Sequence, residues 1–192
     1  MDRIAQLDAI VAQYDLNTHP FYTAWRAGTL PMDRLTDYSG EYGRFVDTIA
    51  DGWETLGYPD YAAEERDHAV MWRMFQKSVG LQTTRDYAQT EVLEHSARTL
   101  FNAGPAEALG ALYAFESQQP HTSRSKLDGL REHYAIDEAG HEYFVVHADD
   151  VHEVEDLRAR TASLTDAEFN RAKSACATVC VAMWSALDGV LA

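Results

Sequence analysis

The chain has little cysteine, with only two residues of this type, Cys176 and Cys180, in its 192 positions. They are four residues apart in SACATVCVAMW, a spacing that places both on one face of a helix. Without two further soft ligands they do not form a zinc site, so we interpret them as small core residues. The first residues, MDRIAQLDAIVAQYD, lack a basic segment followed by an apolar one. We therefore expect a cytoplasmic protein without disulfides.

Basic residues are also scarce, and long apolar runs are absent. There are 16 lysines and arginines against 31 aspartates and glutamates, which gives a formal net charge of −15. Such an acidic excess argues against binding to nucleic acid or to an anionic membrane surface. No apolar run approaches the roughly 18 residues needed to span a membrane. We expect neither nucleic acid nor a membrane as a partner.

No segment has the pattern of a β-strand, and the apolar residues follow a helical period instead. Prolines in HPF and LPMD fit the first turns of helices, and Thr165 with Glu168 forms a capping-box pattern. The sequence predicts a single all-α domain over residues 1–192, a bundle of about seven to eight helices. The expected helices cover residues 2–15, 20–27, 32–56, 60–79, 84–103, 105–134, 138–161 and 165–191.

A carboxylate lies on an apolar helix face in the segment ALGALYAFESQQP. One helix face contains Leu109, Leu112, Tyr113 and Glu116, at positions i, i+3, i+4 and i+7. Carboxylates are almost never fully buried without a partner, because an unpaired buried charge is costly. Glu116 therefore needs a proton, a metal ion or a basic partner, for which Arg124 and Lys126 are nearby in the sequence.

Two other helices carry polar residues on apolar faces in the same way. In AAEERDHAVMWRMF, Glu65 and His68 align with Trp72 and Phe75, and in HEYFVVHADDVHEVEDL, His147 aligns with Phe144, Val151 and Val154. Helical bundles that bind two iron or manganese ions project glutamate and histidine inward from several helices. Spacing alone leaves a metal site and separately hydrogen-bonded core residues as open alternatives.

Four segments carry a resemblance to a known family: HPFYTAWRAGTLPMDRLTDYSGEYGRFV, EERDHAVMWRMF, LYAFESQQPHTSRSKLDGLREHY and EYFVVHADD. Over residues 19–190 the chain resembles the heme-oxygenase-like diiron oxidases and oxygenases, which include the chlamydial death-domain-associating protein. It is more distantly similar to thiaminase II and pyrroloquinoline-quinone synthase. The resemblance implies two irons per chain, with manganese as the alternative, and O2-dependent oxidation of a small organic substrate. An external electron donor and a homodimer are further expectations of the resemblance.

The family takes a glutamate and a histidine from one helix, a glutamate from a second, and a His-x3-Asp-x2-His run from a third. Here the run begins at His147, but Val151 and Val154 stand where the aspartate and second histidine belong. On a straight helix Asp150 is the nearest substitute, whereas a bulge near Asp150–Val151 would turn His152 and Glu155 inward. The ligands we expect from the resemblance are Glu65, His68, Glu116, His147, Asp150 and His152.

Two other functions remain open at this point. A thiaminase II-like hydrolase would need a nucleophilic cysteine in EALGALYAFE, which contains none. A binding or interaction protein could keep the same fold with a vestigial, metal-free site, and the two valines keep this alternative open. Iron content separates it from an oxidase.

Overall fold

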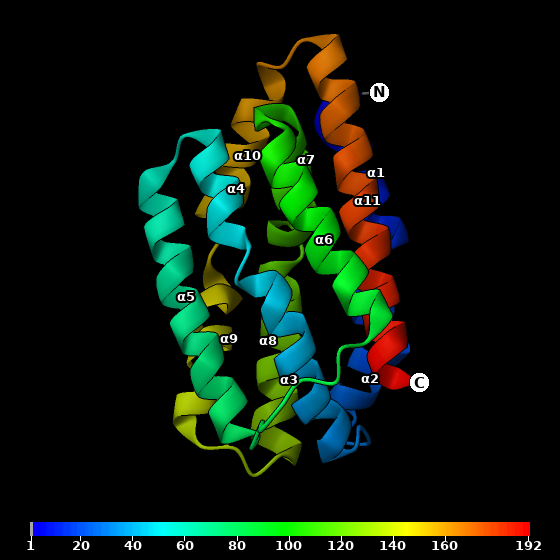
Figure 1. The fold of residues 1–192 in the computed structure, drawn as a ribbon, viewed down its shortest axis with the longest axis vertical. Helices are drawn as coiled ribbons and strands as arrows, with labels where there is room; N and C mark the ends of the chain where they lie inside the picture. The colour runs from blue at the N-terminus through cyan, green and yellow to red at the C-terminus, as the bar shows by residue number, and fades with distance from the viewer. Residues whose placement is uncertain (1) are drawn as a thin grey trace.

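A computed structural model describes residues 2–192, and the helices within this range lie side by side in an elongated bundle (Figure 1). These residues contain no β-strand, as the sequence predicts. The elements are α1 Arg3–Gln13, η1 Leu16–Thr18, α2 Pro20–Arg26, α3 Met32–Val46, α4 Ile49–Leu56, α5 Pro59–Ser78, α6 Ala88–Ala103, α7 Pro105–Glu116, α8 Gln119–His133, η2 Glu138–Gly140, α9 Glu142–Asp149, α10 His152–Ala162 and α11 Asp166–Leu191, where η marks a 3-10 turn.

The longest helix, α11, packs chiefly against α7 and α6. Gly110 lies where α7 crosses α11, and a Cβ atom at this position would come within 1.9 Å of the carbonyl oxygen of Ala172. The two backbones can approach so closely only because residue 110 has no side chain. This contact fixes α7, and hence Glu116 at its end, against the main helix of the bundle.

By length and composition α11 could also cross a membrane. However, 56% of its most apolar stretch is buried inside the bundle, as in the core helix of a soluble domain. Its apolar character is therefore weak evidence for a membrane span.

Three of the helices expected from the sequence are each divided. Residues 32–56 form α3 and α4, and residues 105–134 form α7 and α8. Pro120 accounts for the second division, because its ring and missing N–H would break the interior of a continuous helix. Glu116 consequently lies at the last position of α7.

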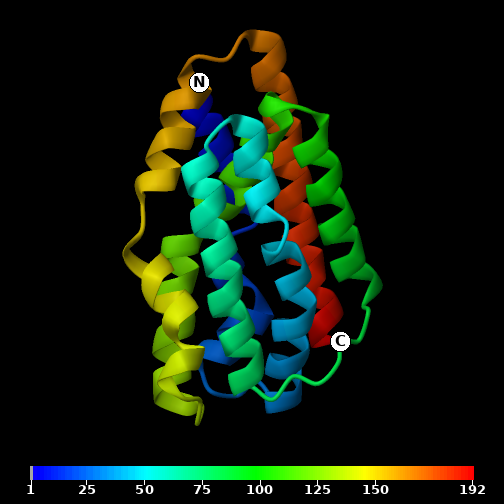
Figure 2. The same ribbon diagram turned by 60° about the vertical axis from the view of Figure 1, so that its left-hand side comes forward.

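The division of residues 138–161 matters most for the site. The turn η2 and helix α9 are followed by a break at Asp150, whose backbone is extended with φ −82° and ψ 121°. The carboxylate of Asp150 accepts a hydrogen bond from the backbone N–H of His152 at 3.2 Å, and α10 begins there. Figure 2 shows α9 and α10 following each other along one side of the bundle, joined by a non-helical link. The single helix expected over 138–161 is thus wrong.

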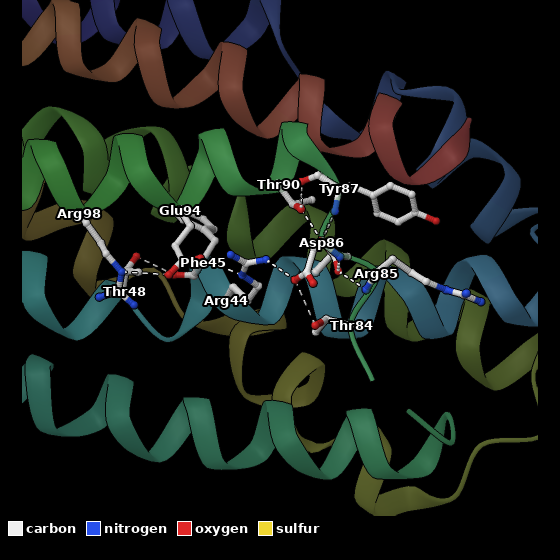
Figure 3. A network of polar contacts seen from close by, with 11 residues as sticks. Arg44, Phe45, Thr48, Thr84, Arg85, Asp86, Tyr87, Thr90, Glu94 and Arg98 are labelled. Carbon is white, nitrogen blue, oxygen red and sulfur yellow. Dashed lines mark hydrogen bonds and ion pairs between the residues drawn. The ribbon is translucent and has the colours of Figure 1, made fainter. Parts of the chain in front are cut away.

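A buried carboxylate away from these breaks, Glu41, shows how such a group is satisfied without a metal. Glu41 is 1% exposed and accepts hydrogen bonds from the backbone N–H groups of Arg85, Asp86 and Tyr87 at 2.7, 2.9 and 3.1 Å. The hydroxyl of Thr90 donates another. Arg44 pairs with Asp86 beside this segment, and Glu94 lies between Arg44 and Arg98 (Figure 3). Both oxygens of Glu41 are therefore partnered.

Candidate metal centre

Five buried carboxylate and imidazole groups come together from four different helices. Glu65 and His68 lie on α5, Glu116 on α7, His147 on α9 and Glu153 on α10. Their exposed fractions are 1%, 7%, 1%, 2% and 4% respectively.

These residues form two adjoining groups of possible ligands. In one, atoms of Glu65, His68 and His147 all lie within 4.8 Å of one another, and in the other the same holds for Glu65, Glu116 and Glu153. Glu65 belongs to both groups. Because a carboxylate has two oxygens, Glu65 is placed to contribute to two neighbouring metal positions.

Four atoms of this cluster are buried without a hydrogen-bond partner: Glu65 Oε2, Glu116 Oε2, His147 Nε2 and Glu153 Oε1. Leaving such a group unsatisfied costs about 1–3 kcal/mol, and more when it is charged. Four of them in one place, from four helices, is unlike the fully bonded Glu41. The unsatisfied atoms are the ones that a cation would bind.

The hydrogen bonds that do exist orient the ligand atoms. His147 donates from Nδ1 to the carbonyl oxygen of Tyr143 at 2.7 Å, which leaves the Nε2 lone pair directed into the site. The indole N–H of Trp53 donates to Glu116 Oε1 at 3.3 Å, and His68 Nδ1 lies 2.8 Å from Glu65 Oε1. Metal-binding histidines are typically held in this way through their second ring nitrogen.

The electrostatics of the metal-free site agree with this interpretation. Burial, followed by the nearby carboxylates Glu153 and Glu65, raises the pKa of Glu116 well above its ordinary range. Burial and the charge of Glu65 raise the pKa of Glu153 to about 9. Burial and the neighbouring His68 lower the pKa of His147 to about 3. Burial, the largest single effect, lowers the pKa of His68, but its hydrogen bond with Glu65 and the charges of the nearby carboxylates together outweigh burial and raise it.

Three carboxylates and two imidazoles are a donor set that suits iron or manganese. A cation would neutralise the carboxylates and bind the orphaned lone pairs, so the residues present fit a pair of such ions. Each of the five side chains would serve as a ligand.

The basic partners considered for Glu116 from the sequence lie elsewhere. Arg124 pairs with Asp149 at 2.6 Å. The amine of Lys126 lies over the rings of Tyr22 and Phe144, 5.1 and 5.4 Å from their centres, and burial lowers its pKa to about 7. Within residues 2–192 neither forms an ion pair with Glu116, so the salt-bridge explanation of this glutamate is wrong.

The structure brings together four of the predicted ligands, Glu65, His68, Glu116 and His147. It places Asp150 in the link between α9 and α10 and His152 at the first position of α10, and both lie outside the two groups. His152 is 46% exposed there, with its Nδ1 paired to Asp150 and its Nε2 3.5 Å from Glu64 Oε2. The apolar stripe expected on a straight helix is also interrupted, because Val151 is 52% exposed.

Glu153 was missed by the sequence reasoning, which instead turned Glu155 inward through a bulge. Glu155 is exposed. The complete break at Asp150 resets the helical phase, so the buried face of α10 is formed by Glu153, Leu157 and Thr161. This four-residue spacing is visible in the sequence once a helix is started at His152, and it places Glu153 on the core side.

The fold and the cluster define a helical-bundle protein with a buried carboxylate and histidine centre. The model of a family described as iron-containing redox enzymes matches residues 42–186, and the chain belongs to this family. It is accordingly an oxidoreductase with iron as its cofactor.

Curated relatives carry a more specific description. The chain is 29% identical to a 4-aminobenzoate synthase of Nitrosomonas europaea, over 96% of this chain and 89% of the relative. It is 24% identical to a 4-aminobenzoate synthase of Chlamydia muridarum, over 100% of this chain and 91% of that one.

Solved structures share the fold. A domain with a heme oxygenase-like fold from Shewanella denitrificans has a TM-score of 0.82 at 17% identity, covering 100% of this chain and 92% of its own. A TenA homologue from P. horikoshii has a TM-score of 0.79 at 15% identity, covering 99% and 98%. These likenesses confirm the predicted heme-oxygenase-like bundle.

Proposed function

We propose that the chain is a non-heme iron oxygenase that uses O2 and forms 4-aminobenzoate. The reaction rests on the names of the curated relatives, and the number of irons rests on geometry. Two adjoining groups of ligands, joined by Glu65, support two ions per chain. Manganese in either position is the alternative that the same donor set allows.

The observation that carries the proposal is the convergence of four unpartnered buried atoms from four helices. A vestigial site would lose nothing by replacing these groups with apolar side chains, and burying them unsatisfied is costly. Their convergence in one cluster at this cost therefore favours a working metal centre over a metal-free binding protein.

When bound, iron supplies the one-electron chemistry with O2 that side chains lack. The chain's own residues provide the ligands, the orientation and the exclusion of water. Tyr143 holds His147 in one tautomer through its carbonyl oxygen, and its ring packs 4.1 Å from the His147 ring. Trp72 packs on Tyr143 at 4.8 Å between ring centres. These aromatic rings cover one side of His147, and the low exposure of the five ligand residues strengthens the electrostatic interactions inside the site.

A thiaminase II-like hydrolase has little support. Its cysteine would have to stand in α7, whereas Cys176 and Cys180 lie on α11 with no exposed surface. The likeness to the TenA homologue, at 15% identity, concerns the fold alone.

The function is tested by loading metal-free protein with Fe(II) under anaerobic conditions and then admitting O2. With the small-molecule fraction of a cell extract added as the source of the organic substrate, we expect O2 consumption and the appearance of 4-aminobenzoate, detected by mass spectrometry. Mn(II)-loaded protein is run in parallel. Repeating the reaction with and without an added chemical reductant tests the proposed external electron donor. Iron-loaded protein that consumes O2 but forms no 4-aminobenzoate under either condition would overturn the proposed product. The proposal that the protein is an iron-dependent oxidase would still stand.

A further inference from the structure

A third group of possible ligands lies outside the buried centre and shares one residue with it. Atoms of Glu64, His152 and Glu153 all lie within 4.8 Å of one another. The side chains of Glu64 and His152 are 52% and 46% exposed, whereas Glu153 is buried. This outer group therefore reaches from solvent to the wall of the centre.

His152 is held in the orientation of a metal ligand. Its Nδ1 pairs with Asp150, and its Nε2 lies 3.5 Å from Glu64 Oε2. The ring packs against Tyr61 with 5.1 Å between ring centres, and the Tyr61 hydroxyl donates to Asp156 at 2.7 Å. Metal-binding histidines commonly donate one ring N–H to a carboxylate, as Nδ1 of His152 can do to Asp150, while the other nitrogen binds the cation.

Glu153 supplies a second observation that points to a ligand in the outer group. It is 4% exposed, its Oε1 has no hydrogen-bond partner, and it belongs both to the outer group and to the group with Glu65 and Glu116. An exposed pair of Glu64 and His152 alone would be an ordinary surface interaction. The shared, unsatisfied carboxylate connects that pair to the interior.

The three groups thus form a continuous series in which each group shares one glutamate with the next. Glu153 links the outer group to the middle one, and Glu65 links the middle one to the pair His68 and His147. We propose that Glu64, Asp150, His152 and Glu153 form an entry site where a divalent metal ion first binds before it moves to the buried positions. The inference rests on the proposed function, because it assigns a route to that centre.

The test compares metal uptake by three proteins. The first is the wild type, and the second is the double variant Glu64→Gln with His152→Gln. The third is a matched control, Glu155→Gln with His95→Gln, which removes the same residue types from exposed positions. Each metal-free protein is mixed anaerobically with Fe(II), and the iron that a chelator can no longer remove is counted over time.

We expect the entry variant to reach the iron content of the wild type but to load at least about tenfold more slowly, at the lower end of the effect of a charged entrance on association rates. The control should load at the wild-type rate. Equal rates in all three proteins, or an equal loss in the control, would overturn the entry site and leave the buried centre intact. A wild type that acquires no protected iron would overturn the centre itself, and the entry site with it.

Discussion

At the scale of single residues, the contrast between Glu41 and Glu116 separates a structural carboxylate from a ligand. Both are 1% exposed. Glu41 accepts four hydrogen bonds, whereas Glu116 receives one, from Trp53, and its second oxygen has none. Burial alone therefore does not identify a metal ligand, whereas buried carboxylate and imidazole atoms that converge without partners do.

The first prediction concerns Glu116→Gln. A neutral amide keeps an acceptor for Trp53 and removes a carboxyl group whose charged form burial and the neighbouring carboxylates disfavour, as the raised pKa of Glu116 indicates. We expect the metal-free variant to be as stable as the wild type or up to about 1–3 kcal/mol more stable, with loss of metal binding. Urea denaturation and iron analysis measure both. Lower stability with unchanged iron affinity would make Glu116 a structural residue instead.

The second prediction follows from the raised pKa of Glu153, from 4.5 to about 9. Between these values the metal-free folded state keeps a proton that the unfolded state has lost, so its stability falls as pH rises. Lys126 and His147, whose pKa values are lowered, act in the opposite direction. Glu153 is therefore isolated by comparing the wild type with Glu153→Gln.

Relative to this variant, the metal-free wild type should lose unfolding free energy as the pH rises from about 5 to 9, by at most about 1 kcal/mol per pH unit. Chemical denaturation at several pH values measures the difference. Glu155→Gln, which changes an exposed glutamate on the same helix, should show no such slope. Parallel pH curves for the wild type and Glu153→Gln would contradict the burial of an unpartnered carboxyl.

At the scale of secondary-structure elements, sequence reasoning succeeded where the helices are regular. The side chains with an unbroken helical period before them could be predicted from spacing to point inward: Glu65, His68, Glu116 and His147.

The inward direction of Glu153 could not be predicted, because the extended backbone at Asp150 changes the helical phase of all the residues after it. One residue's conformation decides between Val151, His152, Glu153 and Glu155 as the inward position, and local patterns do not fix it.

The third prediction concerns this link between α9 and α10. Few internal hydrogen bonds hold it, whereas His147 and Glu153 on either side would be tied to the metal. We expect backbone amides of residues 149–153 to exchange rapidly in the metal-free protein and more slowly with Fe(II) bound. Amides near Cys180 in α11 serve as the control, protected in both states. Unchanged exchange in protein that contains iron would place the link outside the metal-responsive part of the bundle.

At the scale of the whole molecule, the all-helical bundle could be predicted from composition, period and capping signals. The close packing of α7 on α11 could not be predicted. A glycine inside an apolar helix, such as Gly110, indicates only lower helix stability unless the neighbouring backbone of Ala172 is known. The fold as a whole holds the ligand-bearing helices α5, α7, α9 and α10 around the centre, with α11 supporting α7 from behind.

The fourth prediction tests that support. Gly110→Ala places a methyl group in the path of the Ala172 carbonyl oxygen and must push α7 away from α11. We expect a loss of about 1–3 kcal/mol in unfolding free energy, as for other overpacked cores. Because α7 carries Glu116, iron affinity should fall as well. A variant with wild-type stability and iron content would show that the space between residue 110 and the Ala172 carbonyl oxygen can hold a methyl group.

The central claim, two adjoining metal positions joined by Glu65, is tested most directly by anaerobic Fe(II) titration of the wild type, Glu153→Gln and Glu155→Gln. The wild type and Glu155→Gln should bind two irons per chain. Glu153→Gln should bind one, because the position formed by Glu65, Glu116 and Glu153 loses a ligand while that formed by Glu65, His68 and His147 stays complete. A wild type that binds no iron, or a Glu153→Gln variant that still binds two with unchanged affinity, would contradict this arrangement.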